Sequence, residues 1–162
     1  MADPNEPIYQ SLRPLQIMIL AMMVGILAFA AVAVAVSRQF DHQADLGPLL
    51  LLALAAVGLG ELLAYSVLRR ATINRLRKLV QADPAGQVQP TTLAPGLVTL
   101  RIIAAAMAEG FGLFGMVVFL VTGTAIALAA PVLALVILTR LVPTRDRISR
   151  FLAEVSGQPF PR

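Results

Sequence analysis

The chain has 162 residues, of which 58% are hydrophobic and only 14% charged, and its net charge is +4. Soluble domains carry about 25% charged residues, so this composition excludes an ordinary soluble domain and indicates a single all-α integral membrane domain. The absence of cysteine excludes disulfides, thiolate metal sites and a cysteine nucleophile, and the single histidine excludes a multi-histidine metal centre within one chain. We therefore expect neither a metal nor a cofactor.

Four apolar stretches have the length of membrane-crossing helices, which need roughly 17–25 residues. The sequence predicts these spans at residues 15–36, 48–68, 98–121 and 125–142. Pro14 suits the first turn of the first helix, while Pro131 predicts a kink or a late start in the fourth and shortest span. Only residues 122–124 separate the last two spans, so these should form a tight antiparallel hairpin. The expected fold is four transmembrane helices arranged as two hairpins.

The middle connection, residues 69–97, divides into two parts. Residues 71–81 predict a basic amphipathic continuation of the second helix, which either rests on anionic headgroups or is simply the frayed end of that helix. Its apolar side would carry Ile73, Leu76, Leu79 and Val80. The segment from Asp83 to Gly86 should end the helix, and residues 90–96 are expected to be extended or turning.

Basic residues are concentrated in two regions of the chain. The middle connection and the C-terminal region from Arg140 onward hold five each, whereas the other two connections hold only Arg38 between them. The positive-inside rule therefore places both termini, the middle connection and the tail of residues 143–162 in the cytoplasm. We expect a multi-pass protein of a bacterial inner membrane. Because the basic excess follows the span ends, it reports topology and gives no indication of nucleic-acid binding.

Two glutamates interrupt the apolar spans, Glu61 in the second and Glu109 in the third. A carboxyl group in hydrocarbon costs at least ~2.5 kcal/mol and usually marks a functional site. Glu61 precedes Arg69 by eight residues and Glu109 follows Arg101 by eight, which places each carboxyl about 12 Å inward from an arginine at the cytoplasmic helix end. On consecutive antiparallel helices, the two carboxyls are then expected to face each other at one depth.

Such a pair cannot ionise fully in a dry interface at low cost, so it would share a proton or bind a monovalent cation. The alternative is that each carboxyl is protonated and hydrogen-bonded to a neighbouring helix, with Tyr65 or Ser66 as the partner. The sequence leaves both alternatives open.

Small residues form one stripe on each of these two spans, with the glutamate at its edge. Such stripes allow helix backbones to approach closely in membranes, so they predict helix packing and self-association. The stripe residues are Ala53, Ala56, Gly60 and Ala64 on the second span, and Ala105, Ala108, Gly112 and Gly115 on the third.

The segment AMAEGFGLFGMVVFL, residues 106–120, resembles the carboxylate-bearing outer helix of the rotary ATPase c subunit, the proteolipid. In that family an Ala-rich lead precedes the ion-binding Glu, an aromatic residue follows five positions later, and Gly follows at six. Glu109, Phe114 and Gly115 match these positions. The resemblance implies that Glu109 is the ion-carrying carboxyl and that Glu61 stands where some of these rings place an inner-helix ligand.

The resemblance covers about 15 residues, and the chain departs from the family elsewhere. The second span has only Gly58 and Gly60 in place of a repeated Gly-x-Gly track. The middle connection is longer than the family's short polar loop. The chain also has two spans more than the family's hairpin, and these place both termini in the cytoplasm.

Two functions remain in competition. The first is a small oligomerising membrane protein in which the pair Glu61 and Glu109 binds a proton or cation, as a c-like proteolipid or an ion-conducting element. The second is a structural or accessory subunit of a larger membrane complex, with the glutamates in helix–helix packing. The GxGxxG of residues 110–115 lies mid-membrane and does not indicate a dinucleotide site. We expect no enzyme, and as partners only the lipid bilayer, further copies or other membrane subunits.

Overall fold

A computed structural model describes residues 6–39, 42–82 and 90–144, which form an all-helical structure. Three long helices, two 3-10 turns and one short helix make up these residues. Helices α1, α2 and α3 are long and apolar enough to cross a membrane, whereas α4 belongs to a shorter apolar segment, Ala125–Leu141. The prediction of four spans is therefore confirmed for three helices, in their length and apolar character. In chain order the elements are α1 (Glu6–Ser37), η1 (Ala44–Leu46), α2 (Gly47–Gln81), α3 (Pro90–Thr122), η2 (Ala125–Leu128) and α4 (Ala129–Leu141).

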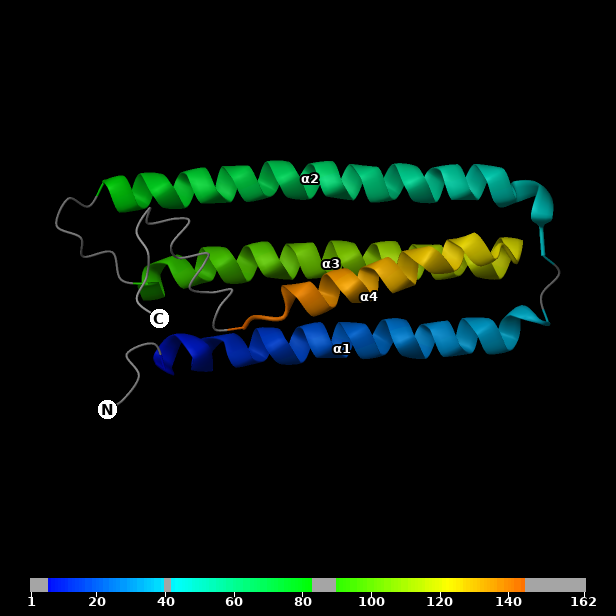
Figure 1. Ribbon diagram of the computed structural model, residues 1–162, viewed down its shortest axis with the longest axis horizontal. Coiled ribbons are helices and arrows are strands. Elements are labelled where there is room, and N and C mark those ends of the chain that lie inside the picture. The colour runs from blue at the N-terminus through cyan, green and yellow to red at the C-terminus, as the bar shows by residue number, and fades with distance from the viewer. Residues whose placement is uncertain (1–5, 40–41, 83–89, 145–162) are drawn as a thin grey trace.

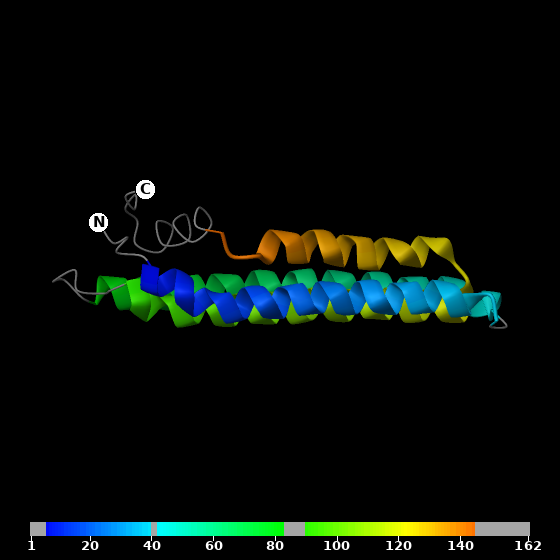
Figure 2. The same ribbon diagram turned by 90° about the horizontal axis from the view of Figure 1, so that it is seen from below.

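Helix α3 is the centre of the structure. Figure 1 shows α1 and α2 on opposite sides of α3, and Figure 2 shows the three long helices as one layer with α4 lying on one face. The main contacts of the structure join α3 to each of the other three helices, and α4 also contacts α1. The first two helices thus follow each other in the chain without packing side by side, which differs from the expected hairpin.

The connection between α1 and α2 is long enough to pass the end of α3, and it is hydrogen-bonded to that end. The backbone N–H of Gln43 donates to the carbonyl of Val121 at 2.9 Å. Gly123, which ends α3 with a φ of +68°, contacts the ring of His42. Glycine adopts this left-handed conformation at no steric cost, and a helix commonly ends on it. This end of α3 therefore contacts the residues that lead into α2.

The hairpin of α3 and α4 is tight because small residues face each other across it. A Cβ atom placed at Gly112 would lie 2.8 Å from the Cβ of Ala134, and one at Gly115 would meet Ala130. Any larger side chain at these two glycines would push α4 away from α3. The backbones can approach this closely only because both sides present small residues.

The start of α4 explains why the fourth span is short. Residues 125–128 form the 3-10 turn η2, and the α-helix begins only at Ala129, so Pro131 falls in its first turn. Proline is tolerated there because the first backbone N–H groups of a helix have no partner within the helix. Of the two outcomes expected at Pro131, the structure has the late start.

Two helix beginnings differ from expectation. Helix α1 begins at Glu6, so that Pro14 lies inside it, and α3 begins at Pro90, so that residues 90–96 are helical and not extended. Pro90 occupies the first position of α3, where the fixed φ of proline suits a helix start. Tertiary packing supports this added turn, since a Cβ at Gly96 would lie 3.2 Å from the side chain of Leu76 on α2.

Helix α2 continues without interruption through the basic segment and ends at Gln81. At 35 residues it is about 52 Å long, well beyond the ~30 Å of a hydrocarbon core. Ile73 and Leu76 are buried in this extension, whereas Leu79 is exposed. The apolar side of the segment thus packs mainly on α3. The expected helix terminator at residues 83–86 lies outside the described residues.

Candidate functional site

The glutamates of the two apolar helices α2 and α3 lie at the same level of the layer. Oε1 of Glu61 would be 4.0 Å from a Cβ placed at Gly110, which directly follows Glu109 on α3. The spacing of each glutamate from its arginine predicted that the two carboxyls lie at one depth. The position of α2 beside α3 agrees with this prediction. Both glutamates are half-buried.

The two carboxyl groups nevertheless point at different helices. Oε1 of Glu109 would be 3.7 Å from a Cβ at Gly25 on α1, whereas Glu61 reaches α3 from the α2 side. Because α1 and α2 lie on opposite sides of α3, each carboxyl occupies its own interface (Figure 1). In each interface the carboxyl oxygen meets a glycine, whose missing side chain leaves room for it. The two carboxyls therefore lie at one depth but on opposite sides of α3, and they do not face each other.

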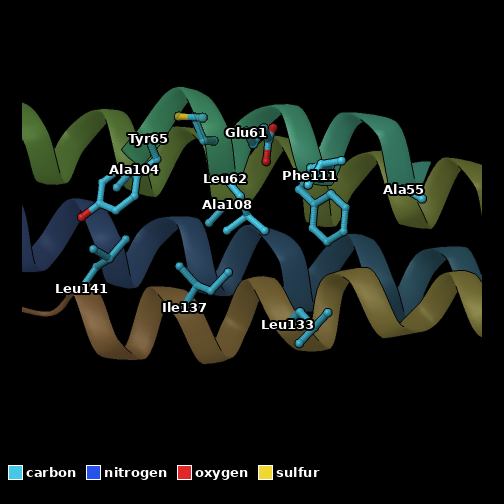
Figure 3. A pocket seen from close by; sticks show the side chains of 13 residues that line it. Ala55, Glu61, Leu62, Tyr65, Ala104, Ala108, Phe111, Leu133, Ile137 and Leu141 are labelled. Carbon is cyan, nitrogen blue, oxygen red and sulfur yellow. The ribbon is translucent and has the colours of Figure 1, made fainter. Parts of the chain in front are cut away.

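Of the two residues expected to assist the glutamates, Ser66 is hydrogen-bonded elsewhere and Tyr65 points away from Glu61. The hydroxyl of Ser66 donates to the carbonyl of Leu63 on its own helix at 2.8 Å. Tyr65 is half-buried, and Figure 3 shows its hydroxyl directed toward Leu141, away from Glu61.

A groove of about 590 Å³ opens between α2 and α4, with α3 as its floor. Figure 3 shows the carboxyl of Glu61 at the middle of this groove, between Tyr65 toward one end and Phe111 on the other side. Glu61 is the single charged residue among those that line it, and Tyr65 is the other one with a polar side chain. The remaining lining residues are Ala55, Gly58, Leu59, Leu62, Ala104, Met107, Ala108, Phe111, Leu133, Ile137 and Leu141.

The groove exists because α4 is displaced toward α1. Helix α4 contacts α3 and α1, which leaves the face of α3 next to α2 uncovered (Figure 1). On that face the ring of Phe111 packs against the backbone of α2, where a Cβ at Gly58 would lie 2.7 Å from its Cε2. Because residue 58 is a glycine, the backbone of α2 can approach the ring of Phe111 closely. Sequence reasoning did not find this groove, because it depends on the order of the helices around α3.

The two stripes of small residues have different surroundings. On α3, Ala105, Ala108, Gly112 and Gly115 are all buried, and the two glycines lie against α4. On α2, Ala53 is half-buried, but Ala56, Gly60 and Ala64 are exposed, and no atom lies within 4 Å of a Cβ placed at Gly60. The α3 stripe forms a contact within the chain, whereas most of the α2 stripe faces outward.

Arg101 has a structural position that its sequence context did not indicate. It lies inside α3, is 9% exposed, and donates from Nη1 to the carbonyl of Leu141 at 3.1 Å. A cation at the C-terminus of a helix satisfies a free carbonyl and interacts favourably with the helix dipole. Arg101 therefore holds the end of α4, and it does not mark the end of its own helix as expected.

Comparison of the chain with protein-family models, with curated proteins and with solved structures found no match.

Proposed function

We propose that the chain is a multi-pass protein of a bacterial inner membrane in which Glu61 and Glu109 each bind a proton or a monovalent cation. One observation carries this proposal: Glu61 meets α3 at Gly110, beside Glu109, so both carboxyls share one depth within helices of membrane-spanning length. An intramembrane carboxyl is costly and marks a functional site by default. Because the two carboxyls do not face each other, each would bind a separate proton or cation instead of sharing one.

The charge distribution supports an orientation with both termini in the cytoplasm. The start of α1, the end of α2 and the start of α3 lie at one end of the layer, and the end of α4 points the same way (Figure 1). The C-terminal half of α2 carries the basic residues Arg69, Arg70, Arg75, Arg77 and Lys78. By the positive-inside rule this end faces the cytoplasm.

Modification by a hydrophobic carbodiimide tests the ion sites, because this reagent reacts with protonated carboxyls inside a membrane. We expect mass spectrometry to find Glu61 and Glu109 modified in the full chain, and we expect alkaline pH or a high Na⁺ concentration to slow both reactions. Asp45, which is exposed outside the long helices, is the internal control and should stay unmodified. Modification that neither pH nor Na⁺ affects would contradict ion binding.

A second function, self-association or docking in a larger membrane complex, is favoured by the outward face of α2. Ala56, Gly60 and Ala64 recur every four residues on an exposed face, a spacing that supports close packing of a second helix. We expect Gly60→Leu to reduce the particle mass measured in native detergent or lipid. An unchanged mass would indicate that this face contacts only lipid.

A further inference from the structure

We propose that the groove between α2 and α4 binds an organic monovalent cation with an apolar body, whose charge is held by the carboxylate of Glu61. The inference rests on the proposed function only in taking Glu61 as an ionisable group within the membrane. It adds the class of ligand and the surface that receives it.

The size and lining of the groove fit such a ligand. Its volume of about 590 Å³ lies within the ~300–1,000 Å³ typical of small-molecule sites, which combine apolar walls with a few polar groups. Of the 13 side chains drawn along the groove in Figure 3, only Glu61 is charged, and none is basic. A cation that enters would therefore meet one negative charge with no lining cation competing for it.

The lining favours a monovalent organic cation over a divalent metal ion. Ca²⁺ and Mg²⁺ require several oxygen ligands, whereas the side chains of this groove offer oxygen only at Glu61 and Tyr65. An ammonium or phosphonium ion needs one carboxylate if apolar walls surround its substituents. The ring of Phe111 beside Glu61 provides an aromatic surface of the kind that attracts organic cations.

The depth of Glu61 favours a free amphiphile over a lipid headgroup. Glu61 lies eight residues before Arg69, which corresponds to about 12 Å of helix between the carboxyl and the basic end of the span. The amine of a lipid headgroup stays at the membrane surface, so it would not reach this carboxyl. A compact cation that partitions into the bilayer can reach it from the open side of the groove.

Equilibrium dialysis of radiolabelled tetraphenylphosphonium against the full chain in dodecylmaltoside, with binding to empty micelles subtracted, tests the proposal. We expect saturable binding that Glu61→Gln weakens by about thirtyfold, as for the loss of one partner of a buried ion pair. Asp45→Asn is the matched control, because this carboxyl is exposed outside the long helices and does not line the groove. It should bind as the wild type does.

A second pair of variants tests the groove without changing any charge. Ile137 lines the groove, whereas its neighbour Val136 is similarly exposed and does not. We expect Ile137→Trp to fill the groove and to weaken binding at least about tenfold, which equals 1.4 kcal/mol, while Val136→Trp leaves it unchanged. Circular dichroism establishes that each variant folds.

The outcomes separate this inference from the proposed ion sites. Tetraphenylphosphonium should protect Glu61, but not Glu109, from carbodiimide. Wild-type binding by Glu61→Gln, or equal saturable binding of the anion tetraphenylborate, would overturn the inference and indicate an apolar site for lipid or a partner helix. If Na⁺ and pH still control the carbodiimide reactions in that case, the proposed function stands and only the ligand assignment fails.

Discussion

Oε1 of Glu61 lies 4.0 Å from the Cβ position of Gly110, and this contact brings the glutamate of α2 to the level of the glutamate of α3. Glu109 itself turns toward Gly25 on α1. The central helix therefore separates two carboxyls of equal depth, one in the α1–α3 interface and one on the groove. This separation means that the two sites can be altered independently.

Replacement of Gly25 by leucine should affect Glu109 alone. A Cβ at Gly25 is already in contact with Oε1 of Glu109 at 3.7 Å, so the further carbons of leucine would press on the carboxyl and cover it. We expect Gly25→Leu to slow carbodiimide modification of Glu109 while Glu61 reacts at the wild-type rate. Val24→Leu, at an exposed neighbouring position, is the control. Equal slowing of both glutamates would show that they share one site.

Replacement of Gly112 by leucine should destabilise the fold. Its Cβ would lie 2.8 Å from the Cβ of Ala134, and overpacking of this kind costs about 2 kcal/mol. Ala31→Leu adds a leucine at an exposed position of α1, so its free energy of unfolding should be near that of the wild type. Thermal unfolding followed by circular dichroism in detergent measures both. Equal losses would contradict the described α3–α4 packing.

The periodicity of the sequence predicted much of what these variants test. Apolar length located the three long helices, and small-residue spacing identified the α3 face that receives α4. The hydrophobic pattern of a membrane helix does not say which helix is its neighbour, because lipid and protein surroundings are both apolar. The position of α3 between α1 and α2, the groove beside α4 and the turn of Glu109 toward Gly25 therefore could not be predicted from the chain alone.

Arg101 shows a related limit. An arginine near the start of an apolar run suggests a helix end, since cations favour the membrane surface. Its role in binding the carbonyl of Leu141 depends on where α4 ends, 40 residues later in the chain. The prolines show the same limit of sequence-based prediction. Pro14 and Pro95 both lie inside helices, which their length and packing stabilise.

Arg101→Gln should loosen the C-terminal end of α4. A hydrogen bond from a charged donor contributes about 2 kcal/mol, and the shorter neutral side chain cannot restore the bond to the carbonyl of Leu141. We expect lower thermal stability and faster proteolysis after residue 141. Arg38→Gln, a change at an exposed residue, is the control. A stability equal to that of the wild type would show that Arg101 does not stabilise the end of α4.

The absence of cysteine makes the orientation directly measurable with single substitutions. Asp45→Cys and Lys78→Cys place thiols at exposed positions toward opposite ends of α2. A membrane-impermeant maleimide should label Asp45→Cys in intact cells and Lys78→Cys only after the cells are opened, as the positive-inside rule requires. The reverse pattern would place the basic end of α2 outside.

Infrared difference spectroscopy of the chain in lipid tests the ion sites most directly, because it detects the C=O stretch of each protonated carboxyl inside the membrane. We predict two such bands, one missing in Glu61→Gln and the other in Glu109→Gln, and we predict that each decreases as Na⁺ or alkali is added. Bands that neither variant removes, or that ignore cations and pH, would contradict proton or cation binding at these two glutamates.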